Sequence, residues 1–164
     1  MEKNYILSPE VAAKKLKRMA FEILENNFGE TSFILAGIRE SGTVIAQTIQ
    51  NLLSEIAGIQ AELITVSLDK KNPTTVTVSR LLDFRNQVII LIDDVSNSGK
   101  TLLYAIKPFL DSNPKKIQTL VLVERSHNTF PVKPDYVGLS VATTLQEHIY
   151  VEVEKGRVKG AWLE

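Results

Sequence analysis

Residues 88–101 read VIILIDDVSNSGKT, and this stretch says more about fold and function than any other part of the chain. Residues 88–92 are apolar and mostly β-branched, which is typical of a central strand buried on both faces of a parallel sheet. Two adjacent carboxylates, Asp93 and Asp94, follow this strand. A short loop of small polar residues then leads to a helical pattern from Thr101. The stretch therefore predicts a strand, a loop and a helix.

The loop of residues 96–100 has the composition of an anion-binding turn. Because it lies between a strand and a helix, its backbone N–H groups are free to point at an anion, and the helix dipole adds to the attraction. Gly99 lets the backbone approach closely, and the hydroxyl groups of Ser98 and Thr101 are further donors. Carboxylates beside such a turn accept hydrogen bonds from a diol. The combination predicts a site for a sugar phosphate.

Two other interpretations of this stretch remain open. The tetrapeptide SGKT, residues 98–101, resembles the end of the P-loop of nucleoside triphosphatases. That motif has a glycine five positions before its second glycine, where this chain has Asp94, and a carboxylate there would repel a triphosphate. An ordinary strand–turn–helix unit without a ligand is the other interpretation. It leaves two neighbouring carboxylates at a buried edge without partners, which is costly.

The chain has 164 residues, of which 44% are hydrophobic and 23% charged, and its formal net charge is zero. These values are ordinary for a globular protein, and the length fits one domain spanning residues 1–164. Zero net charge means that a nucleic-acid contact would depend on a local basic patch. The chain has no cysteine, which excludes disulfides, and no apolar run approaches the about 20 residues of a membrane helix. We expect a cytoplasmic protein with no membrane partner and no signal peptide.

Predicted strands alternate with predicted helices, which indicates a parallel sheet with right-handed crossovers. Ser8 and Pro9 are expected to start the first helix, and Gly29 to end it. The expected helices span residues 8–27, 42–56 and 99–111. The expected strands span residues 33–36, 61–68, 88–92 and 117–123, with an antiparallel ribbon at 74–79 and two short strands, 136–141 and 149–153, that close the chain.

A second glycine-flanked turn, GIRESG at residues 37–42, follows the first core strand and leads into a helix. Its N–H groups are expected to be free in the same way as those of the first loop. In parallel sheets, ligands bind at the carboxyl ends of the strands. The loops beyond Gly37 and Ile92 are therefore expected to line one cleft.

The order of an apolar strand, two acidic residues, a short spacer and Ser-Gly-x-Thr resembles the signature of the type I phosphoribosyltransferases. The opening ILSPE (residues 6–10), the GIRESG loop and the segment ERSHNTFPVKPDYVG (residues 124–138) resemble one family among them. This is the bifunctional pyrimidine-operon attenuator / uracil phosphoribosyltransferase family, and the likeness extends over nearly the whole chain. It implies an α/β fold with a central parallel sheet flanked by helices. It also implies a small hood built from the N- and C-terminal segments.

The resemblance implies an enzyme that transfers ribose 5-phosphate from phosphoribosyl pyrophosphate to a pyrimidine base, with uracil as the best guess. Asp93 and Asp94 would be catalytic, and Mg2+ would arrive with phosphoribosyl pyrophosphate rather than on protein ligands. The base would meet the backbone at Val137, Gly138 and Val141. The residues that bind phosphoribosyl pyrophosphate would be Ser96, Asn97, Ser98, Gly99, Lys100 and Thr101 in one loop and Arg39, Glu40, Ser41 and Gly42 in the other.

The chain also departs from the family pattern. Glu40 and Ser41 stand where the family has threonine and arginine, so a cation is lost and an anion gained beside a polyanionic ligand. Residues 67–70, SLDK, replace the family's Tyr-Arg-Asp-Asp, and the candidates for the missing cation are Lys70, Lys71 and Arg80. These differences keep a second interpretation open, in which a regulatory protein of the same fold senses a nucleotide or phosphoribosyl pyrophosphate with little catalysis.

The expected partners are small-molecule substrates and further copies of this chain, in a homodimer or a larger oligomer. An exposed Phe21 is the residue that suggests such a contact between copies. RNA is a further partner implied by the resemblance, but the surface that would bind it has fewer basic residues than in the family. Basic residues of the family correspond here to Asn128, Lys133 and Leu139, so one charge remains, and each lost phosphate contact lowers affinity. Four basic side chains within residues 14–18 compensate in part.

Overall fold

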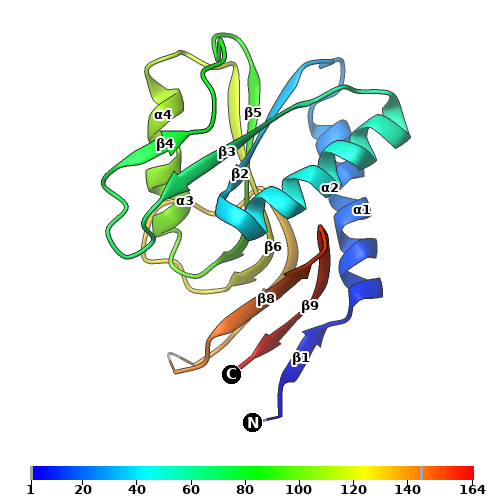
Figure 1. The fold of residues 1–164 in the computed structure, drawn as a ribbon, viewed down its shortest axis with the longest axis vertical. Helices are drawn as coiled ribbons and strands as arrows, with labels where there is room; N and C mark the ends of the chain where they lie inside the picture. The colour runs from blue at the N-terminus through cyan, green and yellow to red at the C-terminus, as the bar shows by residue number, and fades with distance from the viewer. Residues whose placement is uncertain (1, 145) are drawn as a thin grey trace.

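The computed structural model describes residues 2–144 and 146–164, and its centre is a six-stranded sheet (Figure 1). The strand order is β4-β3-β2-β5-β6-β7. The pairs from β3 through β2, β5 and β6 to β7 are parallel, and β4 joins β3 antiparallel, as the predicted ribbon. The predicted α/β class is confirmed. The strands are β2 (Phe33–Ile38), β3 (Glu62–Leu68), β4 (Val76–Val78), β5 (Val88–Ser96), β6 (Lys116–Arg125) and β7 (Tyr136–Val141).

Helices cover both faces of this sheet (Figure 1). The long helices α1 and α2 lie on one face, and the short helices α3 and α4 lie on the other. Side chains alternate across a strand, so β5 sends residues 88, 90 and 92 to the first core and residues 89 and 91 to the second. This explains why the strand is apolar at every position up to residue 92. The helices are α1 (Pro9–Asn26), α2 (Arg39–Ala57), α3 (Lys100–Ala105) and α4 (Lys107–Leu110).

A separate three-stranded antiparallel sheet joins the two ends of the chain, with the order β1-β9-β8. Its strands are β1 (Asn4–Leu7), β8 (Ile149–Glu154) and β9 (Arg157–Leu163). Leu7, Ile149 and Ala161 from its inner face belong to the same core as α1 and α2. The two short strands expected at residues 136–141 and 149–153 are present as β7 and β8, but they do not close the chain, because β9 follows β8. Neither β1 nor β9 was predicted from the sequence.

The helix boundaries differ from the predicted ones in three places. Helix α1 begins as expected, with the Ser8 hydroxyl accepting from the Val11 N–H at 3.2 Å, but Asn27 rather than Gly29 caps its end. Helix α2 begins at residue 39 rather than 42. The single helix predicted over residues 99–111 is two short helices that break at Ile106, just before Pro108. Proline has no N–H to continue the hydrogen-bond ladder, which accounts for the break.

The structure gives no sign of a membrane-spanning helix. Within residues 2–144 and 146–164, no helix is both long enough and apolar enough to cross a bilayer.

Candidate functional site

A cleft of about 740 Å³ opens at the carboxyl ends of β2, β3 and β5. Three segments that are distant in the sequence line it: the start of α2, the end of β3 with the turn after it, and the end of β5. The expectation that the segments after Gly37 and Ile92 share one cleft is confirmed. Its polar lining consists of Arg39, Glu40, Ser41, Thr43, Thr65, Ser67, Lys70, Asp93 and Asp94.

The predicted glycine loop between β2 and α2 is absent, because the strand ends at Ile38 and the helix begins at Arg39. The chain turns at Arg39, whose φ of 49° lies in the left-handed region that non-glycine residues rarely adopt. Gly37 permits this junction, since a Cβ there would lie 2.6 Å from the Cα of Thr43. The residues expected in a loop therefore form the first turn of α2. Its orphan N–H groups and dipole favour an anion, while Glu40 opposes one.

Asp93 and Asp94 lie within β5 rather than after it, because the strand continues to Ser96. Asp93 is 1% exposed, and its Oδ1 accepts from the Asp94 N–H at 2.9 Å. Oδ1 of Asp94 accepts from the Val95 N–H at 2.8 Å. Burial raises the pKa of Asp93 well above the usual value, and the negative charge of Asp94 raises it further. The two carboxylates are thus held rigidly at the cleft, and one of them carries a large desolvation cost.

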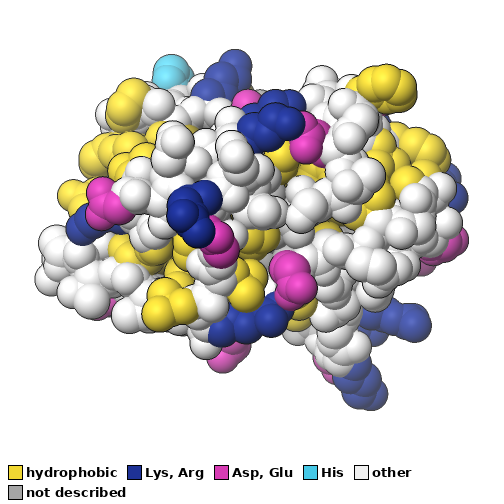
Figure 2. Space-filling view, turned by 90° about the horizontal axis from the view of Figure 1, so that it is seen from above, with side chains coloured by type: hydrophobic (Ala, Val, Ile, Leu, Met, Phe, Trp, Pro, Cys, Tyr) yellow, Lys and Arg dark blue, Asp and Glu magenta, His cyan; other side chains and the backbone are white. Residues whose placement is uncertain are grey.

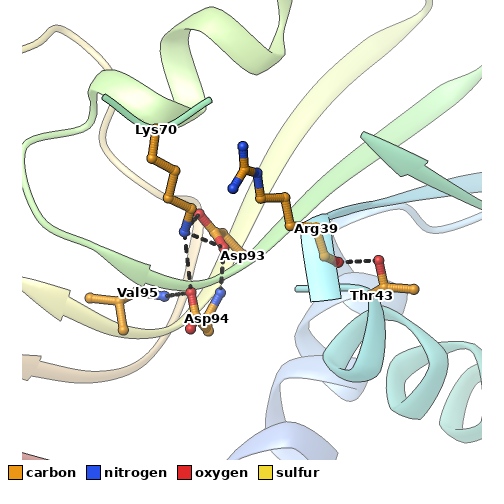
Figure 3. A network of polar contacts seen from close by, with 6 residues as sticks. All are labelled: Arg39, Thr43, Lys70, Asp93, Asp94 and Val95. Carbon is orange, nitrogen blue, oxygen red and sulfur yellow. Dashed lines mark hydrogen bonds and ion pairs between the residues drawn. The ribbon is translucent and has the colours of Figure 1, made fainter. Parts of the chain in front are cut away.

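Lys70, in the turn after β3, lies close enough to offset part of this desolvation cost with its positive charge (Figure 3). Its Nζ lies 3.4 Å from Oδ2 of Asp93 and 3.7 Å from Oδ1 of Asp94, and its positive charge lowers the pKa of Asp93. Figure 3 also shows the Arg39 side chain reaching into the space beside Lys70. Two cations and two β5 carboxylates therefore meet at one place in the cleft.

A second, smaller pocket of about 60 Å³ adjoins this group, and Lys70 lines both spaces. The rest of its wall is the continuous segment Val95–Leu102, which includes all six residues predicted to bind a phosphate in this loop. The Ser96 side chain is 3% exposed, and its hydroxyl has no hydrogen-bond partner among residues 2–144 and 146–164. A buried hydroxyl without a partner is costly, so this pocket is suited to a polar ligand.

Contacts with residues 129–132 hold the small pocket in shape. The Ser98 carbonyl accepts from the N–H groups of Thr129 and Phe130 at 3.1 and 3.0 Å. Gly99 has a φ of 85°, and a Cβ on it would lie 2.8 Å from the Val132 carbonyl oxygen, so glycine is required on both grounds. Because α3 has six residues, its dipole adds less than that of the predicted longer helix.

The three residues predicted to contact a base lie on β7, the edge strand, and none of them lines the large cleft. Val137 is level with Asp93, two strands away in the register Asp93–Val121–Val137. The carbonyl oxygens of Val137 and Gly138 already accept from Nη2 of Arg18, at 3.0 and 3.1 Å. The carbonyl oxygen of Val141 accepts from the Ser126 N–H at 3.0 Å.

The structure also separates the three cations that were candidates for replacing the missing family arginine. Lys70 lies in the cleft, whereas Arg80 pairs with Glu62 at 2.6 Å at the start of β3, and Lys71 lines neither pocket. Thr43, Thr65 and Ser67 also line the cleft and were not predicted as site residues. Ser67 could have been found, since polar residues at the end of a parallel strand face the ligand edge. Gly42, which was predicted to bind phosphoribosyl pyrophosphate, does not line the cleft and is buried behind its wall.

A model of the phosphoribosyl transferase domain matches residues 5–154, and the chain belongs to the type I phosphoribosyltransferases. Its sequence relatives include the bifunctional protein PyrR of Clostridium acetobutylicum, which is 34% identical over 162 residues, covering 93% of this chain and 91% of that protein. The bifunctional protein PyrR of Caldicellulosiruptor bescii is 35% identical over 166 residues, covering 94% of this chain and 91% of that protein.

Solved structures confirm the fold. The hypoxanthine phosphoribosyltransferase of Trypanosoma cruzi matches with a TM-score of 0.78 at 11% identity, covering 98% of this chain and 95% of that one. A hypoxanthine-guanine phosphoribosyltransferase of Bacillus anthracis matches with a TM-score of 0.72 at 18% identity, covering 87% and 85%. The main sheet with its flanking helices and the small antiparallel sheet thus form the type I phosphoribosyltransferase fold that the sequence resemblance implied.

Proposed function

We propose that the protein transfers ribose 5-phosphate from phosphoribosyl pyrophosphate to a pyrimidine base, with uracil as the first candidate. One observation carries the proposal: the Asp93–Asp94 pair stands between a pocket with a buried unpartnered hydroxyl and a larger cleft with cations. A small polar pocket suits a phosphate, adjacent carboxylates suit a diol, and cations suit a second phosphate group. Phosphoribosyl pyrophosphate presents these three groups in this order.

In the proposed reaction, residues 96–101 hold the 5-phosphate and the two carboxylates accept from the ribose hydroxyl groups. The bond between the ribose C1 carbon and the pyrophosphate oxygen breaks, a bond from C1 to a ring nitrogen of the base forms, and the proton of that nitrogen leaves to the departing pyrophosphate or to water. Positive charge develops on the ribose during this exchange, and the carboxylates of Asp93 and Asp94 face it. Arg39 and Lys70 hold the leaving pyrophosphate. Catalysis then consists of positioning and electrostatics, which requires no nucleophilic side chain.

Mg2+ belongs to this proposal as part of the substrate complex. Within residues 2–144 and 146–164 there is no cluster of three or more His, Asp or Glu side chains that could hold a metal ion. Glu40 at the cleft, together with the Asp pair, supplies negative charge that fits a cation already coordinated by pyrophosphate oxygens. Bound there, it would reduce the negative charge of the leaving group.

The base would enter on the β7 side of the Asp pair. Neighbouring strands are about 4.8 Å apart, so Val137 lies about 10 Å from Asp93 on the other side of β6, and a ligand that reaches both would lie over β6. Because Arg18 occupies the carbonyl oxygens of Val137 and Gly138, base contacts at these two residues depend on their N–H groups or on movement of Arg18. RNA binding, self-association and a cytoplasmic location remain part of the proposal on the strength of the family relationship.

A second candidate function is a sensor that binds phosphoribosyl pyrophosphate or a nucleotide with little turnover. The placement of Glu40 favours it, because this carboxylate lies in the first turn of α2, where the pyrophosphate would bind. A negative charge there would weaken pyrophosphate binding and its stabilisation as a leaving group.

Two measurements on the same preparation distinguish these functions. The first is release of pyrophosphate with phosphoribosyl pyrophosphate, Mg2+ and a panel of uracil, hypoxanthine and orotate. The second is calorimetric titration with phosphoribosyl pyrophosphate. Product formation with uracil supports the enzyme, and tight binding without product for any base supports the sensor. If the protein neither binds phosphoribosyl pyrophosphate nor forms product with any base, both functions are contradicted.

A further inference from the structure

We propose that Lys70 is an exchangeable counter-ion, which neutralises the Asp93–Asp94 pair in the free protein and moves to the pyrophosphate of an incoming ligand. This inference rests on the proposed function, and it is argued from the contacts of Lys70 with the two carboxylates. When the exchange occurs, the two carboxylates become available to the ribose hydroxyl groups at the moment when the pyrophosphate needs a cation.

The geometry of the ion pairs fits a partner that can leave. Separations of 3.4 and 3.7 Å are longer than the roughly 2.7–2.9 Å of a tight charged hydrogen bond. The Lys70 side chain is 43% exposed, whereas Asp93 is 1% exposed. The carboxylate is therefore enclosed by protein, whereas the ammonium group has open space beside it. A lysine, with its flexible stem and compact charge, can change partners by rotation about its own side-chain bonds.

The position of Lys70 fits both ends of the exchange. It borders the large cleft, where we place the pyrophosphate, so a short movement of Nζ takes it from the carboxylates to that group. It belongs to an exposed turn, residues 69–72, in which the Asp69 carboxylate accepts from the Lys71 N–H at 2.9 Å. Residues 69–72 are all exposed, so the surroundings leave the Lys70 side chain room to move.

The Asp pair needs a counter-ion in the free protein. An unpaired buried carboxylate next to a second negative charge is costly. Lys70 is the one cation within 4.0 Å of either carboxylate in the described part of the chain. Arg39 makes no ion pair there and remains available to the ligand. Removing Lys70 therefore affects the free protein and the complex in different ways.

The test compares two ligands by calorimetry. One is phosphoribosyl pyrophosphate with Mg2+, and the other is uridine 5′-monophosphate, which has the 5-phosphate and the ribose but no pyrophosphate. For Lys70→Met we expect the affinity for phosphoribosyl pyrophosphate to fall at least about tenfold, because a phosphate loses its cation. The affinity for uridine 5′-monophosphate should stay equal or rise, because the ribose hydroxyl groups no longer displace Lys70. Lys70→Arg should retain most of the phosphoribosyl pyrophosphate affinity.

Lys71→Met is the matched control, since its side chain is exposed, lines neither pocket and should leave both affinities unchanged. The ligand-free pairing is checked by a carboxyl 13C NMR titration, in which Lys70→Met should raise the pKa of Asp93. A parallel loss of both affinities in Lys70→Met indicates a merely structural role and overturns the exchange. So does an unchanged affinity for phosphoribosyl pyrophosphate. If the unmodified protein binds neither ligand, the proposed function itself fails, and the exchange with it.

Discussion

Gly42 lies so close to Ile92 that a Cβ on Gly42 would be 2.6 Å from the carbonyl oxygen of Ile92 and 3.3 Å from the Cα of Asp93. The first turn of α2 therefore packs directly on β5, at the residue before the two carboxylates. This contact places Arg39 and Ser41 on one side of the cleft and Asp93 on the other. Glycine is required here for close approach rather than for an unusual backbone angle.

Replacing Gly42 with alanine is expected to push α2 away from β5. The obstructing atoms belong to the backbone, so we expect a loss of about 1–3 kcal/mol in the free energy of unfolding, measured with urea. Binding of phosphoribosyl pyrophosphate should weaken as well, because the two sides of the cleft separate. Gly58→Ala is the control for binding, since Gly58 lies at the far end of α2 and its φ of 66° makes alanine costly for stability there without moving α2 against β5. Equal binding by the two variants would contradict the expectation.

Asp94→Asn is expected to leave the fold intact and to reduce turnover by at least about tenfold. The amide oxygen of asparagine can still accept from the Val95 N–H, so the local backbone keeps its hydrogen bond. What is lost is the negative charge that faces the developing positive charge on the ribose. Steady-state pyrophosphate release measures the effect, with the exposed Asp111→Asn as a control for general charge effects. Unchanged turnover would remove Asp94 from the mechanism.

Asp93→Asn is expected to change how stability depends on pH. In the folded protein the pKa of Asp93 is raised above its usual value, so between about pH 4 and that raised pKa the folded state holds a proton that the unfolded state has released. The stability of the parent therefore falls as pH rises through this window. The variant lacks this term, and its stability relative to the parent should increase with pH.

Urea unfolding of parent and variant at several pH values above 4 measures this difference. Asparagine keeps the acceptor for the Asp94 N–H, so the comparison isolates the charge. A difference that stays constant over the whole range would show that Asp93 titrates normally in the folded protein.

Arg18→Met is expected to affect the base more than phosphoribosyl pyrophosphate. Arg18 binds the carbonyl oxygens of Val137 and Gly138, on the strand where we place the base, and it lies outside the phosphate and carboxylate groups of the site. We expect the KM for the base to rise several-fold while the KM for phosphoribosyl pyrophosphate stays the same. Lys17→Met, an exposed neighbour on the same helix, is the control. An equal rise in both KM values would indicate a general loss of structure instead.

Charges of both signs are mixed on the face of the molecule seen in Figure 2, in keeping with the zero net charge. In the view of Figure 2, Lys and Arg side chains alternate with Asp and Glu side chains, and no single-sign field covers this face. RNA binding through such a face would need a local basic group, and it is therefore expected to be sensitive to salt. A filter-binding assay with structured RNA over a salt series measures this. Absence of binding at low salt would contradict an RNA-binding role.

The core strands were predictable because burial on both faces leaves a plain signal in the sequence. Residues 88–92 are apolar throughout, and β5 is covered by helices on both sides. The boundaries were less predictable. The strand continues through Asp93 and Asp94, since β6 pairs with it up to Ser96, and the paired residues are 28 positions apart in the chain.

Strands β1 and β9 escaped prediction for a related reason. They form a sheet from opposite ends of the chain, with Tyr5 paired to Trp162, and β9 carries Gly160 at a position where a side chain would meet the Leu7 carbonyl oxygen at 2.7 Å. A glycine in a strand weakens the local signal. Close approach of the opposite terminus explains the glycine, and it is invisible until the two ends are paired.

The sequence by itself determined the α/β class, the order of the core elements and the segment 93–101, because apolar periodicity and the residues of a tight turn are local properties. The tertiary structure decided which side chains share a cleft. In the folded protein Lys70 pairs with Asp93 and Asp94, Arg80 pairs with Glu62, and α2 packs closely on β5. Charges act through space rather than along the chain, so the partner of a buried carboxylate is set by folding and not by its distance in the sequence.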